Sequence, residues 1–342
     1  MANLFTYLSF YVVVYCSFSL ATPMPLKFGF YQNTCPQAEI IVRDAVKNAL
    51  AADPAVPAAL IRLHFHDCFI RGCDGSVLLN STPNNRAEKN SSMNLGIGGF
   101  EVIDDAKSKI EAQCPGIVSC ADIVAFAARD GVQSAGGNPY SVPAGRRDGR
   151  VSLATEVDKN LPGPFFSLMQ LKENFARKGL SLDEMVTLSG AHSIGDSHCS
   201  AFSKRLYSFK STYLQDPSLN GTYLAKFTSF ILLVPISIRT YADFLKTKCP
   251  QSGDTDPTVS LDPGTPSSLD NTYYKNLKVG KGLLASDQVL WTTPATRATV
   301  KSYSNHPSSW ARKFTRAMVH MGSIEVLTGT QGEIRKNCRV MN

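Results

Sequence analysis

The chain has 342 residues, of which 43% are hydrophobic and 18% are charged. These proportions exclude a disordered or fibrous protein and leave room for one large or two medium domains with a sizeable core. The formal net charge is +7, but the 35 lysines and arginines are spread along the chain without a dense run, which argues against a nucleic-acid-binding protein.

Residues 1–21 are the first predicted element, a cleaved secretory signal peptide. They include no charged side chain, and residues 4–20 are almost wholly apolar or small. The stretch ends at Ser19-Leu20-Ala21, a small-x-small pattern typical of a cleavage site. A membrane anchor is the alternative, because the run is about as long as a short membrane span.

Amphipathic helices follow along the chain. Apolar residues recur every three or four positions, which predicts helices over residues 38–53, 99–114, 120–132 and 167–179. Ser181 and Glu184 occupy the positions of a capping box, so another helix is expected to begin there. Segments rich in proline and glycine separate these stretches, for example "GGNPYSVPAGRRDGR" and "LDPGTPSSLD". The pattern predicts one mainly α domain, of either one or two lobes.

The cysteines agree with secretion. Of nine cysteines, Cys16 lies in the signal and eight remain, an even number that predicts four disulfides in an oxidising compartment. The spacing leaves their pairing open, although Cys68 and Cys73 are close enough to close a small loop. The sequons at Asn80, Asn90 and Asn220 are also typical of a secreted protein.

The stretch "RLHFHDCFIRGCDGS", residues 62–76, combines charged residues with apolar ones. Arg62 and His66 are four residues apart, so on a helix they share one face. An imidazole beside a guanidinium suits a reaction that moves a proton while negative charge develops on an oxygen. The alternative is an ordinary exposed helix face, which the spacing alone favours.

The end of the same stretch carries hard oxygen ligands. Asp67, Asp74 and Ser76 surround Gly72 in what reads as a tight turn. Carboxylate and hydroxyl oxygens in such a turn are typical of a calcium site. A solvated acidic loop is the equally open alternative.

Long stretches of the chain resemble the secretory plant (class III) haem peroxidases. "RLHFHDCFIRGCDGSVLL" is similar to their distal haem segment and "LSGAHSIG" to their proximal segment. Further similar stretches include "FYQNTCPQAE", "GRRDGR", "NLPGPF", "DNTYYKNL" and "GTQGEIRKNCRVMN". The resemblance runs from about residue 28 to the C-terminus. It implies a haem-peroxidase domain over residues 22–342, mainly α, with two helical lobes enclosing haem b and few short strands.

The resemblance also implies roles for individual residues. His192 would be the axial ligand of the haem iron, with Asp287 accepting its other ring N–H. His66 would transfer the proton of hydrogen peroxide, Arg62 would stabilise developing charge, and Asn94 would orient His66. Glu88 would belong to the network of Asn94, and Pro162 would help to position aromatic donors.

Two calcium sites and the disulfide pairing are implied in the same way. The ligands of a distal calcium would be Asp67, Asp74 and Ser76 with the carbonyls of Ile70 and Gly72. Those of a proximal calcium would be Ser193, Asp262, Thr265 and Asp270 with the carbonyl of Ser268. The disulfides would be Cys35–Cys114, Cys68–Cys73, Cys120–Cys338 and Cys199–Cys249.

The activity implied is that of a secreted haem peroxidase, which reduces hydrogen peroxide and oxidises phenolic or other small aromatic donors by one-electron steps. We expect a monomer outside the cell, in the cell wall rather than the vacuole, with no nucleic-acid partner and no membrane contact after signal removal. The alternative is a non-enzymatic, secreted calcium-binding or wall-associated protein derived from a peroxidase.

Two segments depart from the family pattern. "MNLGIGGF", residues 93–100, is one residue shorter than usual and lacks its customary arginine. Residues 222–239 read as an insertion, because their removal joins "SLNG" directly to "TYADFLKTKCP", which looks like an uninterrupted family segment. Retained non-coding sequence would explain the insertion, and a genuine loop variant is the alternative.

Overall fold

The structure is a computed structural model that describes residues 25–219, 222–223, 239–252 and 255–342. The α-helices of this described part are α1 (Ala38–Ala52), α2 (Val56–Ile70), α3 (Phe100–Gln113), α4 (Cys120–Ser134), α5 (Ala154–Asn160), α6 (Leu168–Arg177), α7 (Leu182–Ser189), α8 (Ser203–Tyr207), α9 (Tyr241–Lys248), α10 (Thr272–Lys278), α11 (Ala285–Thr292), α12 (Pro294–Asn305) and α13 (Pro307–Met321).

Short strands accompany the helices. They are β1 (Asp196–His198), β2 (Thr222–Tyr223), β3 (Arg239–Thr240) and β4 (Thr258–Ser260). β1 pairs antiparallel with β4, and β2 with β3. The mainly helical architecture with few short strands that the sequence predicts is confirmed.

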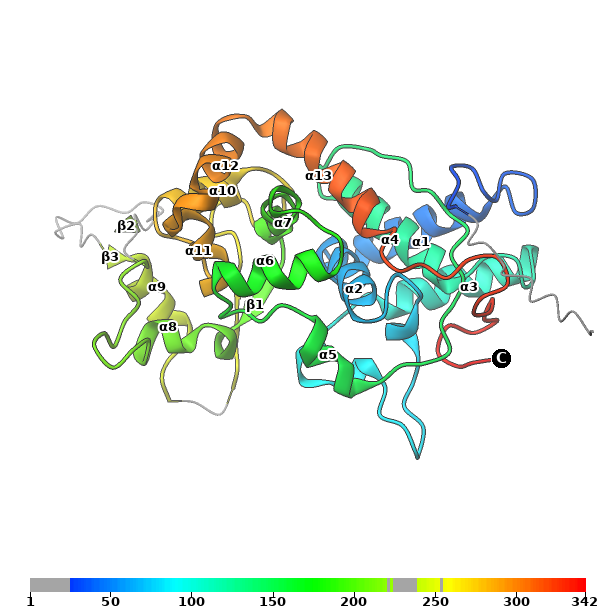
Figure 1. The fold of residues 1–342 in the computed structure, drawn as a ribbon, viewed down its shortest axis with the longest axis horizontal. Helices are drawn as coiled ribbons and strands as arrows, with labels where there is room; N and C mark the ends of the chain where they lie inside the picture. Colours follow the sequence, from blue (N-terminus) through cyan, green and yellow to red (C-terminus); the bar gives the residue numbers. More distant parts are fainter. Residues whose placement is uncertain (1–24, 220–221, 224–238, 253–254) are drawn as a thin grey trace, which may run out of the picture.

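The described residues form three hydrophobic cores; the two larger ones divide most of the helices into two lobes (Figure 1), and the third joins α8 and α9. One larger core, with Val42 and Phe126, joins α1, α3 and α4. The other larger core, with Trp310, joins α7 and α10 to α13. α2 contributes Leu63 to the first core and Phe69 to the second, so this helix lies between the lobes and is buried on nearly all sides.

Three of the predicted helices, α4, α6 and α7, begin at a capping serine, whereas α1 and α3 have no side-chain cap. Ser181 and Glu184 form the expected capping box, in which each side chain accepts a hydrogen bond from the backbone N–H of the other residue, and α7 follows directly. The hydroxyl of Ser119 accepts the N–H of Asp122 and starts α4. Such caps satisfy N–H groups that have no partner within the helix. The helices predicted over residues 38–53, 99–114, 120–132 and 167–179 are confirmed as α1, α3, α4 and α6.

Four disulfide bonds cross-link the described part of the chain. They join the same pairs that the resemblance implies: Cys35–Cys114, Cys68–Cys73, Cys120–Cys338 and Cys199–Cys249. The Cys120–Cys338 bond spans 218 residues and attaches the C-terminal segment to the start of α4. Cross-links over long loops restrict the unfolded chain most, so this bond contributes to stability well beyond its own contacts.

Most of the apparent insertion, residues 224–238, lies outside the described residues, as does the predicted signal at 1–21. The ends of the insertion are described: β2 pairs with β3, and Thr222 lies opposite Thr240. The chain therefore leaves and returns at one place. None of the helices in the described ranges has the length and apolar character that crossing a membrane requires.

Candidate active site

Arg62 and His66 lie one turn apart on α2. The guanidinium of Arg62 donates to two backbone carbonyls, of Gly96 at 3.1 Å and of Met93 at 3.3 Å. These carbonyls belong to the segment that is one residue shorter than usual in the family. Arg62 is exposed, yet burial lowers the pKa of its guanidinium. The Arg62 side chain is thus accessible at its surface but largely surrounded by protein.

Asn94 fixes the tautomer of His66. The amide Nδ2 of Asn94 donates to the backbone carbonyl of Glu88 at 2.9 Å, so its Oδ1 is the atom that faces His66 Nδ1 at 2.7 Å. His66 must then carry its hydrogen on Nδ1, which leaves the lone pair of Nε2 free. Burial and the charge of Arg62 lower the pKa of His66 to about 3, although the hydrogen bond that His66 donates to Asn94 acts in the opposite direction. The imidazole is therefore neutral near pH 7 and able to accept a proton.

His192 stands in a short 3-10 turn, η4 (Gly190–Ser193), that follows α7. Its Nδ1 lies 2.8 Å from Asp287 Oδ1 at the start of α11. Burial opposes protonation of His192, but the Asp287 carboxylate outweighs it and raises the pKa. Because Nδ1–H donates to Asp287, the lone pair of Nε2 is available to a metal. The side chain of His192 remains 39% exposed.

Tyr273 completes the surroundings of Asp287 and was missed in the sequence. Its hydroxyl donates to Asp287 Oδ1 at 2.9 Å, and the N–H of Leu284 donates to Oδ2 at 3.2 Å. Three donors thus hold one carboxylate in place. The stretch that contains Tyr273 resembles the family, but no local pattern marks this hydroxyl as a partner of Asp287.

The distal and proximal segments meet at the start of α2. A Cβ built on Gly195 would lie 3.1 Å from the Cβ of Ala58, one turn before Arg62. The charge of Arg62 also acts on His192 and opposes the increase in its pKa that Asp287 causes. Two imidazoles with free Nε2 atoms, both near Arg62 and one of them openly accessible, fit a haem group between them.

Pro162 lies close to the proximal side. It is partly buried, and the neighbouring Pro164 carbonyl accepts the N–H of Ser286 at 3.0 Å. Ser286 directly precedes Asp287, so the "LPGP" segment is attached to the helix that carries this carboxylate.

Buried oxygen atoms without partners cluster below His66. Asp67 Oδ1, Ser76 Oγ and both carboxylate oxygens of Glu88 have no hydrogen-bond partner among the residues that the structure describes. Burial raises the pKa of Asp67 and Glu88 well above their ordinary values, helped by repulsion from Asp74, and burial raises that of Asp74 to about 6. Buried carboxylates that repel one another are the donor set that a divalent cation neutralises.

Two carbonyls complete the set assigned to the distal calcium. The Gly72 carbonyl accepts the N–H of Asp74 at 2.8 Å, and the Ile70 carbonyl accepts a long hydrogen bond of 3.4 Å from Lys178 Nζ. The carboxylate of Glu88 also belongs to this cluster, which the sequence did not predict. The backbone carbonyl of Glu88 belongs to the Asn94 network as expected, whereas its carboxylate faces Asp67 and Asp74.

A second group of oxygens without partners follows His192. Ser193 Oγ, Asp262 Oδ2 and Thr265 Oγ1 are buried oxygen atoms, and none of them has a hydrogen-bond partner in the described part of the chain. Burial, with a smaller contribution from Asp270, raises the pKa of Asp262 against hydrogen bonds that lower it. The pairing of β1 with β4 brings these segments together, and Ser268 donates its N–H to the Thr265 carbonyl at 3.0 Å.

The donor chemistry of both clusters fits calcium. In the residues that the structure describes, no three His, Cys, Asp or Glu side chains are placed to hold a metal ion by themselves. Both clusters therefore depend on hydroxyl and carbonyl oxygens beside the carboxylates, which suits Ca²⁺ and does not suit a transition metal.

Known proteins match nearly the whole chain. The family model described as Peroxidase matches residues 42–306. Peroxidase 5 of Vitis vinifera is 50% identical over 334 residues, which cover 97% of this chain and 96% of the relative. Peroxidase 64 of Arabidopsis thaliana is 45% identical over 310 residues, 91% of each chain. Peroxidase 1 of Zea mays is 45% identical over 342 residues, 97% of this chain and 88% of the relative.

These matches support an enzyme, and no observation favours the non-enzymatic alternative. They agree with the helical fold and with two histidines placed to serve a haem. The chain therefore belongs to the peroxidase family, within its plant class III branch, and is a haem-dependent peroxidase that acts on hydrogen peroxide.

Proposed function

We propose that this peroxidase is secreted as a monomer, oxidises small phenolic donors and binds two calcium ions beside its haem b. The observation that carries the catalytic part is the neutral imidazole of His66, with Nε2 free, beside Arg62. When bound, haem b supplies the iron centre that reduces peroxide and then oxidises two donor molecules, one electron at a time.

On the distal side, His66 Nε2 accepts the proton of hydrogen peroxide and returns it to the departing oxygen, which leaves as water. Arg62 stabilises the negative charge that develops as the O–O bond breaks. Asn94 holds His66 in the tautomer that this transfer needs, through the 2.7 Å contact with Nδ1. The two hydrogen bonds of Arg62 to backbone carbonyls keep the cation in position.

On the proximal side, His192 would hold the haem iron through Nε2. The hydrogen bond to Asp287 makes the imidazole a stronger electron donor and fixes its orientation. Tyr273 and the backbone of Leu284 keep the carboxylate in place. Pro162, at the edge of the same region, positions aromatic donors.

The function is tested by the spectrum and turnover of the purified protein. A Soret band and peroxide-dependent oxidation of a phenol are expected together. A protein that is folded and binds calcium but shows no Soret band after addition of haem would instead support the non-enzymatic alternative.

Removal of calcium is expected to lower activity and thermal stability together. Asp67 adjoins His66 and Ser193 adjoins His192, so emptying either site leaves repelling or unsatisfied buried oxygens next to a haem-facing histidine. Chelation followed by thermal scans and turnover assays measures the effect, and added calcium should restore both. Calcium-free protein with unchanged activity and Soret spectrum would contradict the proposal.

Secretion rests on residues 1–21 as a signal peptide and on the sequons. Asn80 and Asn90 are exposed in the structure, as glycosylation requires, while Asn220 lies outside the described residues. We place the mature protein outside the cell, in the wall rather than the vacuole.

Residues 222–239 are proposed to be dispensable. The pairing of Thr222 with Thr240 supports this, because the residues on either side of a deletion would already lie close together. The run "FILLVPISI" is apolar and β-prone, so its exposure would promote aggregation. Protein without 222–239 is expected to fold, bind haem and be fully active, and full-length protein to be less soluble.

Peptide mass mapping of the native protein checks this prediction. A peptide in which Gly221 is followed by a single Thr-Tyr would show that the segment is absent from the natural protein. Recovery of peptides spanning 225–239 from abundant, active enzyme would show that the insertion is real and tolerated.

A further inference from the structure

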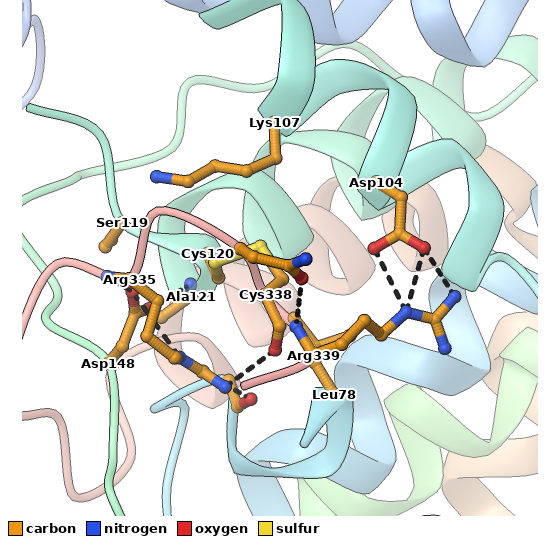
Figure 2. The surroundings of a disulfide bond; sticks show 12 residues. Leu78, Asp104, Lys107, Ser119, Cys120, Ala121, Asp148, Arg335, Cys338 and Arg339 are labelled. Carbon is orange, nitrogen blue, oxygen red and sulfur yellow. Dashed lines mark hydrogen bonds and ion pairs between the residues drawn. A yellow bond between two sulfur atoms is a disulfide. The ribbon is translucent and has the colours of Figure 1, made fainter. Parts of the chain in front are cut away.

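The C-terminal segment, residues 333–339, lies against the start of α4 (Figure 2). It also contacts the distal loop, residues 71–76, which follows α2. The Cys120–Cys338 disulfide attaches it covalently. Asp148 attaches it a second time: its Oδ2 accepts the N–H of Arg335 at 2.8 Å, and its Oδ1 accepts the N–H of Ala121 at 2.9 Å. The segment is thus fixed independently of any metal.

Arg335 points from this segment toward the distal loop. Its side chain is fully buried, with 0% exposed. Nη2 donates to the Gly75 carbonyl at 2.6 Å and Nη1 to the Cys338 carbonyl at 2.8 Å (Figure 2). The guanidinium therefore joins the disulfide-anchored segment to one residue of the loop.

Gly75 stands between two of the proposed calcium ligands, Asp74 and Ser76. Its N–H donates to a third, Asp67, at 3.0 Å. Gly75 has a left-handed φ of 67°, and a Cβ there would lie 2.7 Å from Arg335 Nη2. The turn thus needs glycine both for its backbone conformation and for the close approach of Arg335.

Arg335 also compensates charge. Burial raises the pKa of Asp67 and Asp74, and the guanidinium acts against this effect on both carboxylates. A planar guanidinium is suited to such a buried position, because it donates several hydrogen bonds in fixed directions.

We propose that Arg335 is a positioning residue for the distal calcium: its hydrogen bond to Gly75 fixes the turn that presents Asp74 and Ser76, so the C-terminal segment controls calcium retention. The inference rests on the proposed distal calcium site. It adds a support that contacts the loop backbone without binding the ion.

The variant Arg335→Lys keeps the charge but loses the paired hydrogen bonds to Gly75 and Cys338. Partners that hold ligands in place typically change metal affinity by about 10–100-fold. We expect one of the two calcium ions to be released about 10–100-fold faster into excess chelator, as measured by stopped flow with a fluorescent calcium indicator. The other ion should be released at the wild-type rate, because Arg335 does not contact the proximal cluster.

Arg339→Lys is the matched control. Arg339 lies on the same segment and forms an ion pair with Asp104 at 2.6 Å, with 22% of its side chain exposed (Figure 2). Among the described residues, its side chain contacts Asp104 and the ring of Phe100 on α3 rather than the distal loop, so both calcium ions should be released at wild-type rates. If Arg335→Lys does not fold, Asp148→Asn takes its place, because it weakens the attachment of Arg335 and should accelerate release of the same ion.

The possible results distinguish a failure of the role of Arg335 from a failure of the calcium sites themselves. Wild-type protein that holds two calcium ions, with Arg335→Lys releasing both at the wild-type rate, would overturn the role of Arg335. Tighter calcium binding in Arg335→Met would also overturn it, since only a repulsive charge would then be acting. Wild-type protein that binds no calcium would overturn the calcium sites themselves.

Discussion

His66→Ala is expected to retain haem but to react with hydrogen peroxide several orders of magnitude more slowly. General acid–base assistance accounts for roughly 10²–10⁴ in rate, and peroxide that is no longer oriented adds to the loss. Haem retention is expected because the iron ligand, His192, lies on a different segment. Stopped-flow spectra in the Soret region measure the second-order rate constant with peroxide.

His64→Gln is the matched control for this experiment. His64 lies on the same helix, is 3% exposed and likewise has a pKa that burial lowers to about 3. It contacts Cys68 rather than Asn94, so its replacement should leave the peroxide rate near that of the wild type. Arg62→Leu should be impaired less than His66→Ala. An unchanged rate in His66→Ala would remove His66 from the catalytic assignment.

Arg146→Met is expected to produce the largest loss of stability. Arg146 is 1% exposed and donates to Asp122 Oδ1 at 2.7 Å, to the Gly322 carbonyl at 2.8 Å and to the Pro143 carbonyl at 2.8 Å. Removing it leaves the Asp122 carboxylate buried without its counter-charge, which costs about 3–5 kcal/mol. Differential scanning calorimetry should show a lower unfolding temperature.

Arg150→Met controls for the loss of an arginine as such. Its side chain is 60% exposed and lies 3.3 Å from Glu333, and exposed pairs contribute about 0–1 kcal/mol. The double variant Arg146→Met with Asp122→Asn should recover part of the stability, because no unpaired buried charge then remains. Equal destabilisation by the two single arginine variants would contradict the argument.

The sequence predicts some elements of this fold better than others, for physical reasons. α1 and α6 have one buried and one exposed face, so their periodic patterns locate them well. α2 lies between two cores and is apolar on most sides, so no stripe marks it. From the sequence, Arg62 and His66 are expected to share a face only on the condition that this stretch is helical, and α2 meets that condition.

The residues of the site likewise differ in how well the sequence predicts that they lie together. The distal residues are close in sequence, so Asp67, Asp74 and Ser76 could be read together as oxygen ligands. Ser193 and Asp262 are brought together by the pairing of β1 with β4, and only the family resemblance related them. The backbone carbonyls that hold Arg62 carry no side-chain signal, so sequence reasoning could not identify them.

The contact between Gly75 and Arg335 also bears on how the protein matures. These residues are 260 positions apart, and chains are synthesised at roughly 5–20 residues per second. The distal loop therefore emerges from the ribosome roughly 13–52 seconds before the arginine that supports it. During this interval the distal loop lacks the hydrogen bond that Arg335 donates to Gly75. Any folding enzyme or chaperone that acts during translation thus meets a distal loop without its support, and this support can form only when translation ends.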